Sequence, residues 1–188
     1  MSALFGWIAG GDRASVAAAL VEEPALAAAR DEKGVSAVMY ALYVREPEIA
    51  RLLASTKGDL DAFEAAALAD AGRLGEVLAA DPSAATAWSA DGFTALHLAA
   101  FLGDAVCARL LLERGADVSA VARNPMRVQP LHSAAAARNL EVARLLLEAG
   151  ADPNAEQQGG FRPLDAALQN RDEELQALLL GHGARASR

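Results

Sequence analysis

The sequence predicts an all-α protein built as a solenoid of stacked helix-turn-helix units. The stretch DGFTALHLAAFLGDAVCARLLLERGADVSA at 91–120 returns in altered form as VQPLHSAAAARNLEVARLLLEAGADPNA at 128–155. A third and more divergent copy, FRPLDAALQNRDEELQALLLGHGARA, begins at Phe161. A helix-turn-helix unit repeated about every 33 residues indicates a stack, because a single unit cannot bury its apolar face alone and must pack against its neighbours.

The turn within each unit sets the phase of the repeat. These turns fall at Gly11, Arg45, Ala69, Gly103, Arg138 and Arg171. They are separated by 34, 24, 34, 35 and 33 residues, so the chain holds six helix pairs, of which one is spaced unusually closely. The first two units also match the next two at a constant offset of 58 positions, for example Gly34 with Gly92 and ARLL at 50–53 with ARLL at 108–111. This match identifies the N-terminal stretch as a repeat and not as a signal peptide.

Helical periodicity and boundary residues place two helices in each unit. First helices are predicted at 4–9, 36–43, 62–69, 95–102, 131–137 and 164–170. Second helices are predicted at 15–22, 47–55, 73–80, 104–114, 140–149 and 173–181. Ser36 and Thr94 are suited to accept hydrogen bonds from the first turn of a helix. Pro130 and Pro163 fit the first helical position, where no backbone donor is needed.

The second helices carry an apolar stripe that predicts the face buried against the neighbouring unit. In the fourth unit this stripe includes Val106, Leu110 and Leu111, which recur at i, i+4 and i+5. Cys107, the only cysteine, aligns with Val142 on the apolar face and is therefore expected to be a packing residue. A single cysteine also excludes an internal disulfide and a cysteine-based structural metal site.

The chain resembles the ankyrin repeat family. The resemblance rests on TALHLAA at 94–100, on QPLHSAA at 129–135 and on the GAD turns that follow the second helices of the same two units. It implies one ankyrin-repeat domain over 1–188. The repeats would span about 1–30, 31–58, 59–88, 89–123, 124–156 and 157–188.

The resemblance also implies short β-hairpin fingers that project between the repeats, at 28–35, 86–93, 118–128 and 153–161. The close spacing of the turns at Arg45 and Ala69 removes one finger, because ASTKGDL at 54–60 must connect two repeats directly. We therefore expect a gap in the row of fingers after the second repeat.

His97 and His132 recur at equivalent positions and are the obvious candidates for catalysis or metal binding. In ankyrin repeats this histidine is structural, and Met39 and Asp165 stand at the matching positions of other repeats without a compensating ligand set. The sequence contains no phosphate-binding loop, no HExxH zinc motif and no GxSxG nucleophile motif. We expect no catalytic residue, no cofactor and no metal site, and we do not expect an enzyme.

Large apolar side chains at positions that should face water are the candidate partner-binding residues. In ankyrin proteins the partner docks in a concave groove formed by the finger tips and the last turn of each first helix. The corresponding positions here hold Tyr43, Val44, Trp88, Phe93, Phe101, Leu102, Val128 and Phe161. The resemblance thus implies a non-enzymatic protein-protein interaction module. Two alternatives stay open: some of these side chains pack against an adjoining finger, or the missing finger near 54–60 leaves a pocket for a small regulatory ligand.

Composition limits the class of partner. The chain carries 25 acidic and 17 basic residues, a net charge of −8, and so offers no basic field to bind nucleic acid or an anionic membrane. A protein partner of unknown identity remains, and we expect the chain itself to be a monomer. The single cysteine and the lack of a long apolar run favour the cytoplasm. Fifteen arginines against two lysines, with abundant alanine, favour a bacterial source.

Overall fold

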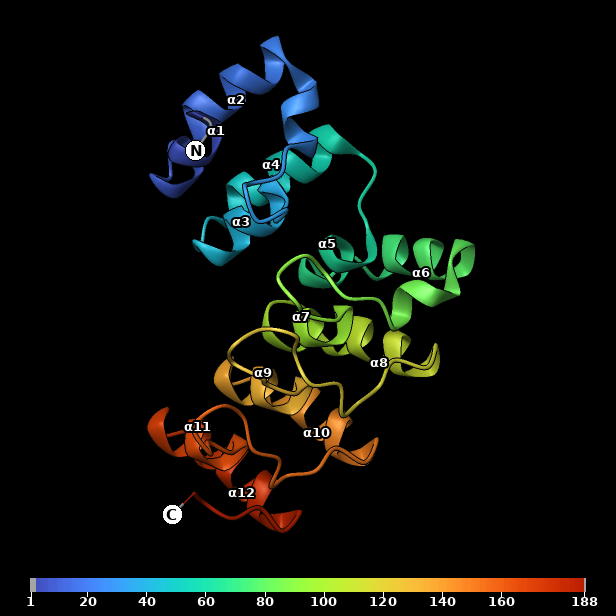
Figure 1. Ribbon diagram of the computed structural model, residues 1–188, viewed down its shortest axis with the longest axis vertical. Helices are drawn as coiled ribbons and strands as arrows, with labels where there is room; N and C mark the ends of the chain where they lie inside the picture. The colour runs from blue at the N-terminus through green and yellow to red at the C-terminus, as the bar shows by residue number, and fades with distance from the viewer. Residues whose placement is uncertain (1–2, 188) are drawn as a thin grey trace.

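Residues 3–187 are described by the computed structural model, and they form twelve α-helices in six consecutive pairs (Figure 1). The pairs are α1 (Ala3–Ala9) with α2 (Arg13–Glu22), α3 (Ala37–Tyr43) with α4 (Pro47–Lys57), α5 (Ala62–Ala67) with α6 (Ala71–Ala80), α7 (Ala95–Phe101) with α8 (Ala105–Glu113), α9 (Pro130–Ala136) with α10 (Leu140–Glu148), and α11 (Pro163–Gln169) with α12 (Glu173–Gly181). Every predicted helix is present, and each end lies within two residues of its expected position. Positions 1, 2 and 188 of the predicted domain lie outside the described residues.

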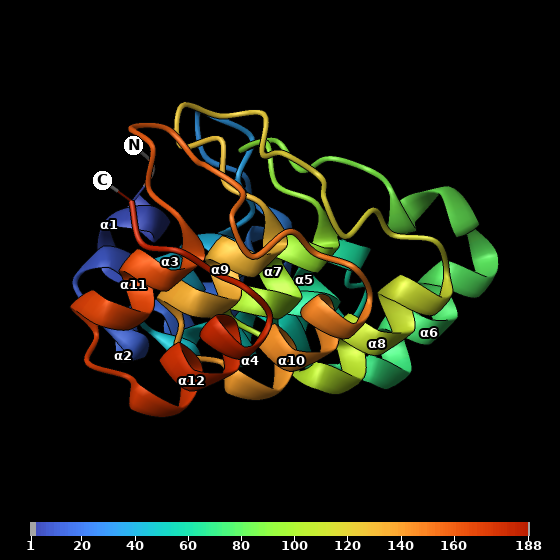
Figure 2. The ribbon, with the colours of Figure 1, turned by 90° about the horizontal axis from the view of Figure 1, so that it is seen from below.

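The twelve helices form two layers. The odd-numbered helices, here called inner, make a continuous row in which each contacts the next from α1 to α11. The even-numbered helices, here called outer, form the second row behind them. Figure 2 looks along the stack and shows the long connecting loops gathered on one side of the molecule. The all-α solenoid expected from the sequence is therefore confirmed.

Most helix boundaries use the predicted chemistry, but Thr94 does not cap α7 as expected, because its hydroxyl contacts Nδ1 of His97 at 2.8 Å. The Ser36 hydroxyl accepts the backbone N–H of Met39 at 3.3 Å, and Pro130 and Pro163 begin α9 and α11. Two short 3₁₀ helices, Pro24–Ala28 after α2 and Pro82–Ala85 after α6, are absent from the sequence-based expectation. Proline at the first position of each fixes φ near the helical value, which favours this extra turn.

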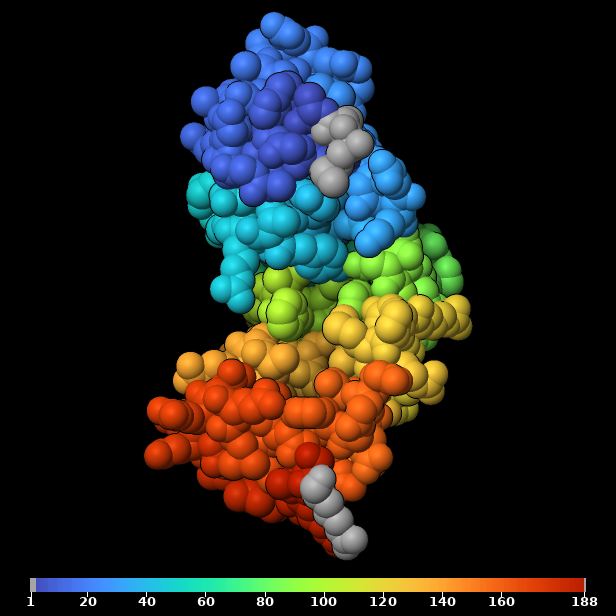
Figure 3. All heavy atoms as spheres, turned by 60° about the vertical axis from the view of Figure 1, so that its left-hand side comes forward, coloured from blue at the N-terminus to red at the C-terminus, as the bar shows by residue number. Residues whose placement is uncertain are grey.

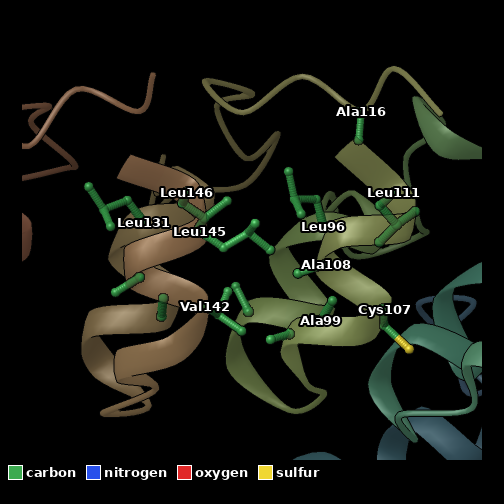
Figure 4. Close-up of a cluster of buried hydrophobic side chains, with 14 of the residues drawn as sticks. Leu96, Ala99, Cys107, Ala108, Leu111, Ala116, Leu131, Val142, Leu145 and Leu146 are labelled. Atoms are coloured by element: carbon green, nitrogen blue, oxygen red, sulfur yellow. The ribbon is translucent and has the colours of Figure 1, made fainter. Parts of the chain in front are cut away.

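Side chains from consecutive repeats meet between the helix pairs to form the core. Figure 4 shows Leu131, Val142, Leu145 and Leu146 of the α9–α10 pair beside Leu96, Ala99, Ala108 and Leu111 of the α7–α8 pair. Cys107 is fully buried, as expected for a packing residue. The expectation for Val106 is wrong. Its side chain is 60% exposed, because Cys107 and Ala108 occupy the buried face of α8.

The core divides at the missing finger. One buried cluster joins the helix pairs from α5 to α12, and a second joins α1 to α4. A small third cluster of Met39, Ala67 and Leu98 links α3, α5 and α7. The outer helices contact one another within each half, whereas α4 and α6 make only marginal contact. The solenoid therefore consists of two packed halves that are joined mainly through the inner row.

Four finger loops are present, before α3, α7, α9 and α11. Each is closed at its base by backbone hydrogen bonding, for example from the Ser89 N–H to the Phe93 carbonyl and from the Ala122 N–H to the Val128 carbonyl. Only two isolated β-bridges occur in the described chain, Arg30 with Ser36 and Trp88 with Thr94. The expected β-hairpins are thus reduced to tight loops, because the paired arms are too short to form a ladder of strands.

The expected gap in the finger row is closed. A Cβ built on Gly34, in the finger before α3, would lie 3.1 Å from Cβ of Ala90 in the finger before α7, so these two loops touch. Adjacent fingers farther along are joined by backbone bonds, such as that from the Arg123 N–H to the Gly92 carbonyl at 2.8 Å. The equivalent carbonyl of Gly34 accepts a hydrogen bond from the Arg30 guanidinium at 2.9 Å. A side chain therefore takes the place of the missing backbone donor.

Candidate functional site

The concave face of the stack carries an apolar groove with a volume of about 440 Å³. In Figure 3 the finger loops run along one margin of this face and the turns within the helix pairs run along the other, with a hollow between them in the middle of the stack. The groove is lined by Tyr43, Asp91, Phe93, His97, Leu98, Phe101, Met126, Val128, His132, Ser133, Ala136 and Gln157. It spans the inner helices α3, α7 and α9 and the fingers before α7, α9 and α11, and most of its surface is apolar.

Three large side chains with high exposure dominate the groove. Phe101, at the end of α7, is 48% exposed, and Met126, in the finger before α9, is 52% exposed. Tyr43, at the end of α3, is 36% exposed. Apolar side chains left open to water in one concavity are typical of a binding surface, because their burial by a partner removes apolar area from water.

Two buried histidines form the floor of the groove. Nδ1 of His97 accepts the Thr94 N–H at 3.2 Å, so Nε2 carries the proton and donates to the Val128 carbonyl at 3.1 Å. His132 repeats the first bond with the Gln129 N–H, but its buried Nε2 makes no hydrogen bond, although the Phe161 and Ala155 backbone lies close to the ring. Burial lowers the pKa of His97 to about 4 and lowers the pKa of His132 as well. Both rings are therefore uncharged near pH 7 and add no charge to the floor of the groove.

Tyr43 and Asp91 tie the two sides of the groove together. The Tyr43 hydroxyl donates to Oδ2 of Asp91 at 2.5 Å, and the Ser89 hydroxyl donates to Oδ1 at 2.5 Å. Burial and the hydrogen bond to Asp91 raise the pKa of Tyr43 above its usual value. Both carboxylate oxygens thus already have donors, and Asp91 serves to hold the groove wall in place.

The structure brings four of the eight sequence-predicted residues together in the groove: Tyr43, Phe93, Phe101 and Val128. The other four lie elsewhere. Val44 packs on the core of the α1–α4 half, and Leu102 packs on the Met39 cluster. Trp88 lies under the Arg123 guanidinium at 4.3 Å and lines a different cavity, while Phe161 is exposed outside the groove.

Sequence reasoning missed several lining residues, of which Met126, Asp91 and Gln157 matter most. Met126 sits in the finger that is two residues longer than its neighbours, and this extra length was the available signal. No sequence signal marked Asp91 or Gln157 as lining residues, because polar residues are common in surface loops. Their place in the groove depends on how the fingers pack on one another.

A comparison with known protein families decides the identity of the fold. A family model described as ankyrin repeats, in three copies, matches residues 63–157 and 122–188. The chain belongs to the ankyrin repeat family. Ankyrin repeats are generally protein-binding modules and are typically not catalytic. A search of curated proteins found no match.

The missing finger of this ankyrin stack leaves a second, smaller cavity of about 230 Å³. It lies between the fingers before α3 and α7 and is lined by Met39, Phe63 and Leu98 below and by Arg30 and Asp61 at the rim. Lys57, at the end of α4, bonds the fully buried Glu64 of α5 at 2.5 Å. Charged pairs therefore supplement the small apolar cluster of Met39, Ala67 and Leu98 where the two halves of the core meet.

Potential chemistry on the ankyrin scaffold is limited. Within residues 3–187 no group of three or more His, Cys, Asp and Glu side chains is arranged to hold a metal ion. Burial raises the pKa of the Cys107 thiol to about 12, which keeps it protonated and unreactive near neutral pH. In the same part of the chain no helix has the length and apolar character needed to cross a membrane.

Proposed function

We propose that this ankyrin repeat protein binds a partner protein non-covalently through the apolar groove, without catalysing a reaction. The observation that carries the proposal is Phe101, an aromatic side chain left half-exposed at the centre of a concave apolar surface. Aromatic side chains in such positions dominate the energy of protein interfaces. Tyr43 and Met126 extend the same surface toward the two margins of the groove.

The test compares capture of the partner by the wild type and by a variant with Phe101→Ser and Met126→Ser. Because both side chains are exposed, melting is expected to change little, while affinity for the captured protein falls by at least about 2 kcal/mol, the size of an interface hot spot. Val106→Ser with Leu180→Ser is the matched control, because these side chains are 60% and 56% exposed on the outer helices. Equal loss of capture by both variants would contradict a groove-centred interface.

The proposal takes the chain as a monomer in the cytoplasm that presents one groove to its partner. Light scattering across a range of concentrations checks this assembly. Concentration-dependent dimers that disappear with Phe101→Ser would show that the groove serves self-association instead.

A small-ligand function at the missing finger has weaker support. The cavity there, at about 230 Å³, is smaller than the range of about 300 to 1,000 Å³ in which ligand pockets usually fall. Its rim groups already have partners, since Arg30 bonds the Gly34 carbonyl and lies 3.5 Å from Asp61. Residues 54–60 line two other, more open concavities of about 370 and 420 Å³, whose walls carry many charged side chains, such as Arg51, Arg73 and Asp81, and no aromatic one. The groove is therefore the better candidate.

A further inference from the structure

The floor of the groove changes in side-chain size from one inner helix to the next. α7 contributes Leu98 and Phe101, and α9 contributes Ser133 and Ala136 at the equivalent positions of the following repeat. The small side chains of α9 leave open the space that leucine and phenylalanine fill on α7. The groove is therefore recessed above α9, next to the half-exposed Phe101 ring.

Ser133 brings to this recess a hydroxyl that has no partner in the protein. The residue is only 8% exposed and lines the groove. In the part of the chain that the structure describes, its Oγ forms no hydrogen bond. Ala65 and Ala166 occupy the equivalent positions of the third and sixth repeats, and alanine is the better helix former. Neither packing nor helix formation accounts for a serine here, since burying an unpaired hydroxyl costs free energy.

Gln157 adds a second neutral hydrogen-bonding group, from the finger before α11. The equivalent residues of two earlier fingers, Asp31 and Ser89, use their side chains to close their own loops. Oδ1 of Asp31 accepts the Val35 N–H, and Oγ of Ser89 accepts the Phe93 N–H. Among the described residues the Gln157 side chain has no such bond, and it lines the groove instead. Its amide, like a serine hydroxyl, can both donate and accept a hydrogen bond.

The lining offers no unpaired charge to an occupant. His97 and His132 are uncharged near pH 7. Among the lining residues Asp91 alone carries a formal charge, and its two oxygens accept the hydroxyls of Tyr43 and Ser89. A charged group entering the groove would lose its water without gaining an ion pair, which is costly. The lining therefore favours an uncharged occupant that is mostly apolar and has one polar group.

We propose that the groove receives one tyrosine side chain from an uncharged segment of the partner protein. The ring packs against Phe101 above Ala136, and its hydroxyl bonds Ser133 and the Gln157 amide. A phenol hydroxyl both donates and accepts, so it can satisfy two groups that do the same, whereas an indole can only donate. Aromatic side chains with a polar edge are typical anchors of protein interfaces.

The size of the groove agrees with a compact anchor. Its volume of about 440 Å³ lies in the range of about 300 to 1,000 Å³ in which pockets that enclose a small organic group usually fall. This inference rests on the proposed function, because it requires the groove to be the surface that binds the partner.

The test first selects ligands without assuming a partner. A displayed library of random peptides of about 15 residues, long enough to form a helix, is panned on the folded protein. The enriched peptides are expected to share one tyrosine within an uncharged, largely apolar stretch. The affinity of a purified selected peptide is then compared with that of the same peptide carrying Tyr→Phe.

A double-mutant cycle assigns the tyrosine hydroxyl to its partners in the groove. Tyr→Phe in the peptide is expected to weaken binding to the wild type at least about fivefold, as loss of one hydrogen bond would. The same change should have little effect on Ser133→Ala with Gln157→Ala, because no group is left to bond the hydroxyl. This variant should fold normally, since alanine stands at the position of Ser133 in other repeats. Thermal melting checks that it does.

The matched control is Ser55→Ala with Gln158→Ala. Ser55 lies on the outer helix α4, where its hydroxyl bonds the Leu52 carbonyl, and Gln158 is exposed in the finger beside Gln157. The control should keep the fivefold preference for tyrosine. Ser133→Leu tests the recess itself, because it gives α9 the residue that α7 has at this position. It should weaken binding of both peptides at least about tenfold without lowering the melting temperature.

Each contrary outcome has a distinct meaning. If peptides bind in a manner that depends on Phe101 but share no tyrosine, or if Tyr→Phe acts equally on both sides of the cycle, the groove stands and the tyrosine anchor is wrong. If peptides bind equally to Phe101→Ser, or if none is enriched, both the groove and its anchor are wrong. Basic peptides that lose affinity for Asp91→Asn would replace the uncharged segment with a cationic one. Binding of N-acetyltyrosine amide as tight as that of the selected peptide would assign the groove to a small aromatic molecule.

Discussion

The hydroxyl of Tyr43 donates a hydrogen bond to the carboxylate of Asp91, 48 residues further along the chain. The bond joins the end of α3 to the finger before α7 and so passes over the repeat that lacks a finger. In a stack with every finger present, the loops before α3 and α7 would be separated by another loop. Loss of one finger thus lets repeats two and four meet, and this contact builds one wall of the groove.

Tyr43→Phe is expected to lower the free energy of unfolding by about 1 kcal/mol, the usual net worth of a hydrogen bond, since the ring still packs but Asp91 loses a donor. Tyr40→Phe is the control in the same helix, because Tyr40 packs edge-on against Phe5 and its ring is unchanged by the substitution. Urea denaturation of both variants gives the comparison. An equal effect at the two positions would show that the Tyr43 bond does not brace the junction.

Acid is expected to destabilise the protein through His97. Its folded pKa of about 4 lies below the value of about 6.5 for an unfolded histidine, because burial disfavours the charged form of the ring. Between these two pH values His97 is protonated in the unfolded chain and stays neutral in the folded chain. Stability present above pH 6.5 is therefore lost as pH falls toward 4, by on the order of 3 kcal/mol, and no further loss from this group follows below that.

The variant His97→Met checks this assignment, because Met39 occupies the matching position in the second repeat. We expect His97→Met to be less stable at pH 7 but to lose less stability between pH 6.5 and 4 than the wild type does. His182→Gln, at an exposed position, should leave the pH dependence as it is. A wild-type slope retained in His97→Met would assign the acid sensitivity to other groups.

The helices could be located accurately from the sequence because the same pattern of apolar and turn residues recurs in every repeat. Six copies of the turn and of the apolar stripe constrain the phase far better than one copy would, which is why all twelve helices were placed to within two residues. The sequence-based prediction was wrong at Val106, which was expected to be buried but is exposed, because the smaller side chains of Cys107 and Ala108 occupy the buried face of α8. It also missed the closing of the finger row, because contacts such as that of Gly34 with Ala90 depend on how whole repeats tilt.

The candidate site was only partly predictable for a related reason. Position within the repeat correctly indicated that Phe101 and Tyr43 lie on the concave face, since both end an inner helix. Position could not separate Phe101 from Leu102, its neighbour, which packs on the Met39 cluster. Side chains on fingers were harder still, because the Trp88 ring is covered by Arg123 from the next finger.

Ala69→Gly is expected to stabilise the protein. Ala69 has a φ of 59° in the turn between α5 and α6, where glycine is favoured because it has no Cβ. Relief of this strain, less the extra entropy of glycine in the unfolded chain, should raise the free energy of unfolding by about 0.5 to 1 kcal/mol. Ala79→Gly, at an exposed position inside α6, should lower it by about 1 kcal/mol. Thermal denaturation measures both variants. A change of the melting temperature in the same direction for both would contradict strain at Ala69.

The divided core predicts that the two halves of the stack lose structure separately. Leu53 is fully buried in the cluster of α1 to α4, and Leu146 is fully buried in the cluster of α5 to α12. Truncation of either leucine to alanine removes about 2 to 5 kcal/mol of packing energy. Because a repeat stack is coupled only through its neighbours, and α4 barely contacts α6, this loss should stay largely within one half.

Hydrogen exchange followed by mass spectrometry should then show faster exchange in α1 to α4 for Leu53→Ala, with protection of α7 to α10 nearly unchanged. Leu146→Ala should show the reverse, and a uniform increase across all helices in both variants would mean that the inner row couples the halves into one cooperative unit.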